Sequence, residues 1–307
     1  MKAVQFAEYG GPEVLRVVEV EAPHAGAGQV RVAIHAAGVN QIDWKIRAGH
    51  MREVIPMTLP AGMGLDGAGI VVEVGEGVRG TAIGDAVFGS GVSTYAEYAV
   101  LSSWTAKPAR LSFEEAAGYP VAVETAIRVL DLVGVQPGET LLVSGAAGGV
   151  GSAVLQIARH RGIKVIATAS ERNRAYVSSL GATATTYGDG LVERVRAVAP
   201  KGIDAALDIA GSGVIPELIS LTGEPKKVLS IADFSAPKLG AQVSDTALNM
   251  AGALEEAARL FVAGAFRIPV AKTFSLAQTG EAQSMSAAGH VVGKLVIKVS
   301  RAPAVQD

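Results

Sequence analysis

The segment that most constrains the fold is residues 140–158, TLLVSGAAGGVGSAVLQIA. An apolar run, a run of small residues and a second apolar run follow one another in it. The first run has the character of a buried strand, and the second has the length of a helix. The glycines between them permit a tight turn. The segment therefore predicts a strand–turn–helix unit of an α/β fold.

The glycines of this turn match the dinucleotide-binding pattern G-x-G-x-x-G with one departure. Ala146 takes the first glycine position, Gly148 the second and Gly151 the third. The second glycine lets a pyrophosphate approach the backbone, and the third lets the helix pack closely on the strand. We expect the phosphates to bind at the start of the helix, at Gly148, Gly149 and Val150. The alternative is a bare turn in a chain with 37 glycines.

The next strand indicates which dinucleotide binds. KVIATAS ends at Ser170, where an NAD-binding fold usually has an Asp or Glu that holds the ribose hydroxyls. Glu171 comes one position later, and Arg172 and Arg174 follow. A hydroxyl and a guanidinium group suit a 2′-phosphate, so the sequence predicts NADPH rather than NADH. The alternative is that both arginines are solvated charges on a helix face; we favour phosphate contact for Arg172 and the solvated face for Arg174.

The character of the chain changes along its length. In the first part, β-branched runs are separated by Gly and Pro at short intervals, as in a barrel or sandwich. Further on, strands alternate with helices, as in a parallel sheet. A strand, GKLVIKV, follows near the C-terminus. We predict a β-rich domain over residues 1–115, an α/β domain over 116–260, and a return to the first domain over 261–307.

Composition restricts the kinds of site that the chain can carry. The 307 residues include no cysteine, which excludes disulfides, thiolate metal sites and cysteine nucleophiles. A net charge of −2 without a basic block argues against nucleic acid as a partner. The N-terminus lacks the apolar core of a signal peptide, and no apolar run is long enough to span a membrane. We expect a cytoplasmic protein with no membrane partner.

Several motifs in chain order carry a family resemblance. SGAAGGVGSAVLQIARHRGIKVIATAS resembles the nucleotide-binding half of the medium-chain dehydrogenase/reductase superfamily, and AAGVNQIDWKIRAGH with AGMGLDGAGIVVEVGEGV resembles its N-terminal half. The combination is most similar to the zinc-free, zeta-crystallin-like quinone oxidoreductases. This resemblance implies a GroES-like β-barrel domain and a Rossmann domain with a doubly wound parallel sheet. It also implies NADPH as the cofactor, a small-molecule substrate and a homodimer.

The zinc ligands of related alcohol dehydrogenases are replaced in this sequence. Those enzymes have a ligand Cys in a segment resembling GVCHTD, whereas this chain has GVNQID with Asn40. They have a His in a GHE segment, whereas this chain has Leu65. Catalytic zinc needs three protein ligands, and neither residue replaces a thiolate or an imidazole. We therefore expect no metal and no zinc-dependent alcohol oxidation.

Without zinc, the resemblance implies hydride transfer to an acceptor that is already electron-poor, either a quinone or an α,β-unsaturated carbonyl. We expect Asn40 to stabilise the developing oxyanion by a hydrogen bond before solvent protonates it. Asp43 either positions Asn40 or a water molecule, or it caps a turn. Met51 stands at or next to the place of a tyrosine acid in some enoyl reductases, which weakens the enoyl-thioester reading.

The resemblance also implies further cofactor contacts. Thr125 matches a threonine near the nicotinamide, and Tyr187 matches a tyrosine near the adenosine phosphate. Packing inside a helix or strand is the alternative for each. Ala210 and Ile231 follow predicted strands, at the ends where open α/β sheets bind ligands. Lys294 reaches the cofactor or lies at the surface.

Two other functions remain open at this point. An enoyl-thioester reductase would differ in its acceptor. A structural or interaction protein of the same superfamily would bind NADPH without turnover. The short-chain dehydrogenase reading is excluded, because no Tyr is followed four residues later by the Lys that its chemistry requires.

Overall fold

The computed structural model describes residues 1–244 and 249–299, and they divide into two compact units. The first unit comprises Met1–Val121, Met250–Ala263 and the chain from Ile268 onward; the second comprises Ala122–Asn249 and Gly264–Arg267. The first unit thus extends beyond the predicted boundary at residue 115. It also takes up helix α8 (Met250–Val262), which packs against two strands of that unit, β6 and β7.

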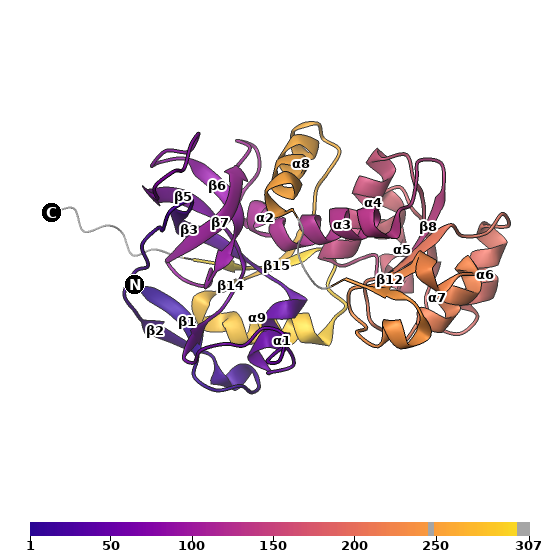
Figure 1. The fold of residues 1–307 in the computed structure, drawn as a ribbon, viewed down its shortest axis with the longest axis horizontal. Helices are drawn as coiled ribbons and strands as arrows, with labels where there is room; N and C mark the ends of the chain where they lie inside the picture. Colours follow the sequence, from indigo (N-terminus) through magenta and orange to yellow (C-terminus); the bar gives the residue numbers. More distant parts are fainter. Residues whose placement is uncertain (245–248, 300–307) are drawn as a thin grey trace. The chain divides into compact units, whose positions relative to one another are not determined.

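Two β-sheets form the frame of the first unit (Figure 1). The smaller sheet has the order β2-β1-β4, and all of its pairings are antiparallel. The larger sheet has the order β14-β15-β3-β5-β6-β7, and β3 also pairs with β7. The strands are β1 (Lys2–Phe6), β2 (Arg16–Glu19), β3 (Val30–Val39), β4 (Ala61–Gly62), β5 (Asp66–Val74), β6 (Ala86–Val92), β7 (Tyr98–Ala106), β14 (Val270–Ser275) and β15 (Lys294–Lys298).

The C-terminal segment completes the core of this unit. β15 runs antiparallel to β3, with Ile297 opposite Ala37, and helix α9 (Thr279–Ala288) contacts helix α1 (Gln41–Arg47). Figure 1 shows these yellow elements among the indigo and purple ones of the N-terminal part. β3 is buried along most of its length, which explains why its sequence is apolar at nearly every position. Short 3-10 helices η1 (Pro12–Val14) and η5 (Leu276–Gln278) complete this part.

The run from Glu114 to Val135, which reads as one helix in the sequence, is two helices in the structure. Helix α2 (Phe113–Ala117) begins at a capping box formed by Ser112 and Glu115, and α3 (Pro120–Val133) begins at a proline. Proline disfavours helical geometry in the residue before it and is favoured in the first turn of a helix. The proline at position 120 thus interrupts the helical run, and the break lies at Gly118 and Tyr119.

The second unit is an open parallel sheet. Its order is β10-β9-β8-β11-β12-β13, and every pairing in it is parallel. Counted from β8, this is the order 3-2-1-4-5-6 of the dinucleotide-binding fold, so the predicted Rossmann sheet is confirmed. The strands are β8 (Thr140–Ser144), β9 (Lys164–Ala169), β10 (Thr183–Thr186), β11 (Ala205–Asp208), β12 (Val228–Ser230) and β13 (Gln242–Val243).

Helices connect the strands of this sheet. They are α4 (Gly149–His160), α5 (Arg174–Ser179), α6 (Leu191–Val198) and α7 (Ile215–Thr222), with short 3-10 helices η2 (Glu171–Asn173), η3 (Pro225–Lys227) and η4 (Ala236–Leu239). The strand order reverses between β8 and β11, and such a reversal is where open α/β sheets bind ligands. In the part of the chain that the structure describes, no helix is long and apolar enough to cross a membrane.

Candidate functional site

The glycines at the second and third positions of the dinucleotide-binding pattern have different surroundings in the structure. Gly148 precedes α4 in an extended conformation, and a Cβ atom added to it would meet no heavy atom of the surrounding described residues within 4 Å. A Cβ atom at Gly151 would lie 2.4 Å from the carbonyl oxygen of Gly145 and 2.6 Å from Cα of Ala146. Gly148 thus leaves open space in front of the helix, whereas Gly151 permits close packing of helix and strand.

Ala146 stands at the first glycine position of the dinucleotide-binding pattern, and the residue before it explains why no glycine is needed there. Gly145 adopts a left-handed conformation, with φ of +87°, and makes the sharp turn after β8. Ala146 is fully buried behind it. The conformational requirement of the motif is therefore met one position earlier than the pattern states.

The carboxyl ends of β8, β11 and β12 meet beside this turn. A Cβ atom at Gly145 would lie 3.0 Å from the backbone nitrogen of Ala210. The buried Asp208 carboxylate accepts hydrogen bonds from Ala210 N at 3.2 Å and from Ser230 Oγ at 2.8 Å. The backbone N–H of Ile231 donates to the Asp208 carbonyl oxygen at 3.1 Å. Ala210 and Ile231 thus follow the carboxyl ends of β11 and β12, and their contact with the cofactor stays a prediction.

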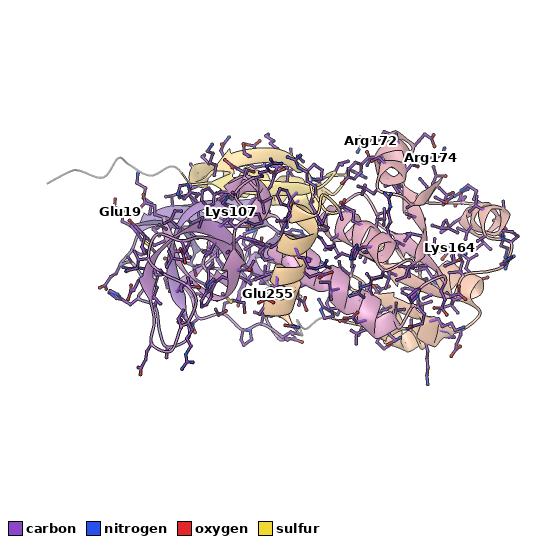
Figure 2. All side chains as sticks on the ribbon, turned by 90° about the horizontal axis from the view of Figure 1, so that it is seen from above. Glu19, Lys107, Lys164, Arg172, Arg174 and Glu255 are labelled. Atoms are coloured by element: carbon purple, nitrogen blue, oxygen red, sulfur yellow. The ribbon has the colours of Figure 1, made fainter. Side chains whose placement is uncertain are left out.

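A hydroxyl group and a guanidinium group follow β9. The Ser170 hydroxyl oxygen is buried and has no hydrogen-bond partner among the described residues. Arg172 is exposed, and no described residue forms an ion pair with it, whereas Arg174 pairs with Glu171 at 2.9 Å. Figure 2 labels both arginines at the surface of the second unit. The orphaned hydroxyl, the unpaired guanidinium and the open space at Gly148 fit a phosphorylated dinucleotide.

Two of the expected cofactor residues have quite different surroundings. Tyr187 follows β10 and is 52% exposed, and its carbonyl oxygen accepts a hydrogen bond from Arg194. Thr125 is buried on α3, with its hydroxyl oxygen 3.4 Å from Nη2 of Arg128. Arg128 in turn forms a buried ion pair with Glu124 at 3.2 Å. Thr125 therefore lies beside a fixed guanidinium group inside the second unit.

A second polar cluster lies within the first unit and joins three strand ends. Asn40 follows β3, Asp66 begins β5 and Lys294 begins β15; these strands are neighbours in one sheet. Asn40 Nδ2 donates to Asp66 Oδ2 at 2.9 Å, and Lys294 Nζ donates to Asn40 Oδ1 at 2.5 Å. Lys294 Nζ also lies 3.9 Å from Asp66 Oδ2. The three residues are only 6%, 0% and 5% exposed, so the surface alternative for Lys294 does not hold.

Asp43 holds the backbone of Asn40 in this cluster. Its Oδ2 atom accepts hydrogen bonds from the Asn40 backbone N–H at 2.7 Å and from the Tyr95 hydroxyl at 2.6 Å. Its other oxygen is buried with no hydrogen-bond partner among the described residues. Asp43 thus caps the start of α1 and at the same time anchors the residue that carries the Asn40 amide.

Burial sets the protonation of this cluster. It raises the pKa of Asp66 to about 7, although Lys294 and Asn40 oppose the rise. It raises the pKa of Asp43 to about 6, against the hydrogen bonds from Tyr95 and Asn40. It lowers the pKa of the Lys294 ammonium group, which the two carboxylates oppose. Near neutral pH the two acids therefore carry less negative charge than two exposed carboxylates would.

Sequence reasoning missed three residues of these sites: Asp66, Tyr95 and Asp208. One signal could have identified Asp66, because a charged residue in the apolar run GLDGAGIVVEV must be buried with a partner. No comparable signal points to Tyr95. In residues 1–244 and 249–299, no group of three or more His, Cys, Asp or Glu residues is arranged to hold a metal ion.

Comparison with known proteins identifies both halves of the chain. Residues 26–110 match the alcohol dehydrogenase GroES-like domain, and residues 149–232 match the domain described as zinc-binding dehydrogenase. The chain is 31% identical to quinone-oxidoreductase QR1, chloroplastic, of Triphysaria versicolor, over 97% of this chain and 98% of that protein. It is 37% identical to 2-methylene-furan-3-one reductase of Solanum lycopersicum, over 69% of this chain and 58% of that protein.

Solved structures give the same assignment. The quinone oxidoreductase of Escherichia coli complexed with NADPH has a TM-score of 0.85 and 25% identity, over 97% of this chain and all of that chain. The expected pair of a GroES-like domain and a Rossmann domain is therefore confirmed, whereas the description of the first domain as a barrel stays a prediction. The chain belongs to the zinc-free quinone oxidoreductases of the medium-chain dehydrogenase/reductase superfamily.

Proposed function

We propose that the protein is an NADPH-dependent, zinc-independent oxidoreductase that transfers a hydride to a quinone or an α,β-unsaturated carbonyl. The observation that carries this proposal is the open space at Gly148 in front of α4, with the orphaned Ser170 hydroxyl after the next strand. The relatives support the acceptor class, since one is a quinone oxidoreductase and another reduces a methylene-furanone, which is a conjugated ketone.

The second unit binds the cofactor. The backbone N–H groups of Gly149 and Val150, at the positive end of α4, bind the pyrophosphate. The Ser170 hydroxyl and the Arg172 guanidinium group bind the 2′-phosphate, which selects NADPH over NADH. Ala210 and Ile231 present the ends of β11 and β12 to the ligand. When bound, NADPH supplies the hydride from its nicotinamide ring.

The Asn40 amide stabilises the negative charge that develops on the acceptor oxygen. One Nδ2 hydrogen is committed to Asp66, and the other has no acceptor among the described residues. That hydrogen donates to the oxyanion, and a preorganised donor of this kind typically contributes about 10²- to 10³-fold to the rate. Asp43 keeps Asn40 in place through its backbone N–H. Solvent then supplies the proton to the reduced product.

The experiment that tests the proposal follows NADPH absorbance in the presence of benzoquinone, phenanthrenequinone, an enone or crotonyl-CoA. Parallel reactions contain NADH, and each is repeated with EDTA. The proposal expects turnover of a quinone or the enone with NADPH, faster than with NADH and unaffected by EDTA. Turnover of crotonyl-CoA alone would instead indicate an enoyl-thioester reductase. NADPH binding without turnover of any acceptor would indicate a binding protein.

We also propose that the protein is a homodimer in the cytoplasm. The family resemblance supports the dimer, and a chain without cysteine fits a reducing compartment. Light scattering of the purified protein should give twice the chain mass of 31.3 kDa. A monomer mass, or recovery in a membrane fraction, would contradict this proposal.

A further inference from the structure

We infer that Lys294 is a positioning residue that fixes the orientation of the Asn40 amide and so decides which end of that amide meets the acceptor oxygen. This inference rests on the proposed role of Asn40. Lys294 itself need not touch substrate or cofactor for it.

An asparagine side chain has two ends of opposite hydrogen-bonding character. Its carbonyl oxygen only accepts and its NH₂ group only donates, and a rotation of the amide exchanges them. A lysine ammonium group has donors and no acceptor, so it faces Asn40 Oδ1, at 2.5 Å. The Asp66 carboxylate accepts, and it faces Asn40 Nδ2, at 2.9 Å. A rotated amide would place NH₂ against an ammonium group and a carbonyl oxygen against a carboxylate.

This fixed orientation leaves one hydrogen of Nδ2 as the free polar end of the side chain. An oxyanion is stabilised by that hydrogen and would be repelled by the carbonyl oxygen of the rotated amide. Without Lys294, only the hydrogen bond to Asp66 opposes rotation of the amide, so the rotated orientation becomes more populated. Lys294 therefore holds the carbonyl oxygen of the Asn40 amide in a hydrogen bond. The second hydrogen of Nδ2 then remains available to the acceptor oxygen of the substrate.

The fold holds the lysine rigidly enough for this role. Lys294 begins β15, and its backbone N–H donates to the Pro269 carbonyl oxygen at 2.9 Å. Its stem lies against Gly118, where an added Cβ atom would be 3.1 Å from Cγ of Lys294 and 3.2 Å from its Cβ. Gly118 thus leaves room for the buried stem. The charge that faces the ammonium group comes from Asp66 and Asp43, which offset the cost of burying it.

The first test compares Lys294→Met with Lys298→Met, a matched control on the same strand. Lys298 is exposed and pairs with Glu114 at 3.1 Å, outside the polar cluster. We expect Lys294→Met to lower kcat for enone reduction at least tenfold, with the Kd for NADPH unchanged. Lys298→Met should leave both values unchanged. Equal kcat values for the two variants would overturn the inference.

The second test separates positioning from folding. Lys294→Met leaves the Asp66 carboxylate buried without its cation, which destabilises the protein. The double variant Lys294→Met with Asp66→Asn removes both charges, so its melting temperature should rise above that of the single variant. Its kcat should nevertheless stay low, because neither partner then fixes the Asn40 amide. Recovery of kcat together with stability would show that Lys294 is only structural.

A third variant keeps this inference distinct from the proposed function. Asn40→Ala removes the donor itself. A low kcat for Asn40→Ala with a normal kcat for Lys294→Met would overturn the role of Lys294 and retain that of Asn40. Normal kcat values for both would overturn the role of Asn40 and the inference with it. An unaltered protein that reduces no acceptor would overturn the proposed function itself.

Discussion

Replacement of Gly148 by alanine should weaken NADPH binding about 10- to 100-fold and leave the free energy of unfolding nearly unchanged. Gly148 has φ of −74°, which alanine adopts without strain, and an added Cβ atom would meet no described heavy atom within 4 Å. The methyl group therefore costs nothing by collision within the protein. A smaller unfolded-state entropy favours the variant by about 0.4–1 kcal/mol, and the weaker preference of alanine for the position before a helix offsets this.

The loss of affinity follows from the same open space. A methyl group there displaces the phosphate from the N–H groups at the start of α4. A hydrogen bond to a charged group contributes about 1.5–3 kcal/mol, and each 1.4 kcal/mol changes Kd about tenfold. Loss of one such bond accounts for the expected range.

Gly151→Ala is the matched control, since it adds the same methyl group three residues further along the chain, in the first turn of α4. Its Cβ atom would lie within 3.0 Å of three backbone atoms of Gly145 and Ala146, which cannot move independently. Overpacking of this kind costs about 1–3 kcal/mol. Titration of NADPH by fluorescence and urea denaturation of both variants measure the two quantities. Normal NADPH affinity of Gly148→Ala, or a large loss of its stability, would refute the assignment of Gly148 to the phosphate-binding site.

Three other outcomes are expected. Arg172→Ala should raise the Kd for NADPH more than the Kd for NADH. Arg174 pairs with Glu171, so Arg174→Ala should change neither Kd in the same titration. Asn40→Ala should lower kcat about 10²- to 10³-fold in steady-state assays, with the Kd for NADPH unchanged. The pKa of Asp66 is raised from 3.8 to about 7, so the folded state binds more protons than the unfolded state between these pH values. Stability should therefore fall as pH rises through this window, and urea denaturation at several pH values should show a smaller fall for Asp66→Asn.

The arrangement of the second unit was predictable because its signals are local. Alternating apolar strands and helices indicate a parallel sheet, and a glycine turn after the first strand indicates where phosphates are expected to bind. Even so, the pattern alone did not show that Gly145, and not the residue at position 146, makes the left-handed turn. The break between α2 and α3 is also local, and the proline at position 120 was its signal.

The polar cluster of the first unit could not be predicted in the same way. Asn40 is 26 residues from Asp66 and 254 residues from Lys294 along the chain. They meet because β15 and β5 flank β3, with Leu295 opposite Val39 and Asp66 opposite Gly38. A strand sequence indicates which face is buried, but strand order and register depend on packing between distant segments. The resemblance identified Asn40 and Lys294 singly, and the structure joins them.

The most direct measurement uses NADPH in which both hydrogens at C4 of the nicotinamide ring are replaced by deuterium, with an enone acceptor in ordinary water. Mass spectrometry and NMR of the product then locate the label. Hydride transfer by this protein predicts deuterium on the β-carbon and a solvent hydrogen on the α-carbon, with or without EDTA. A product without deuterium on the β-carbon, or no oxidation of bound NADPH by either an enone or a quinone, would contradict the proposed reaction.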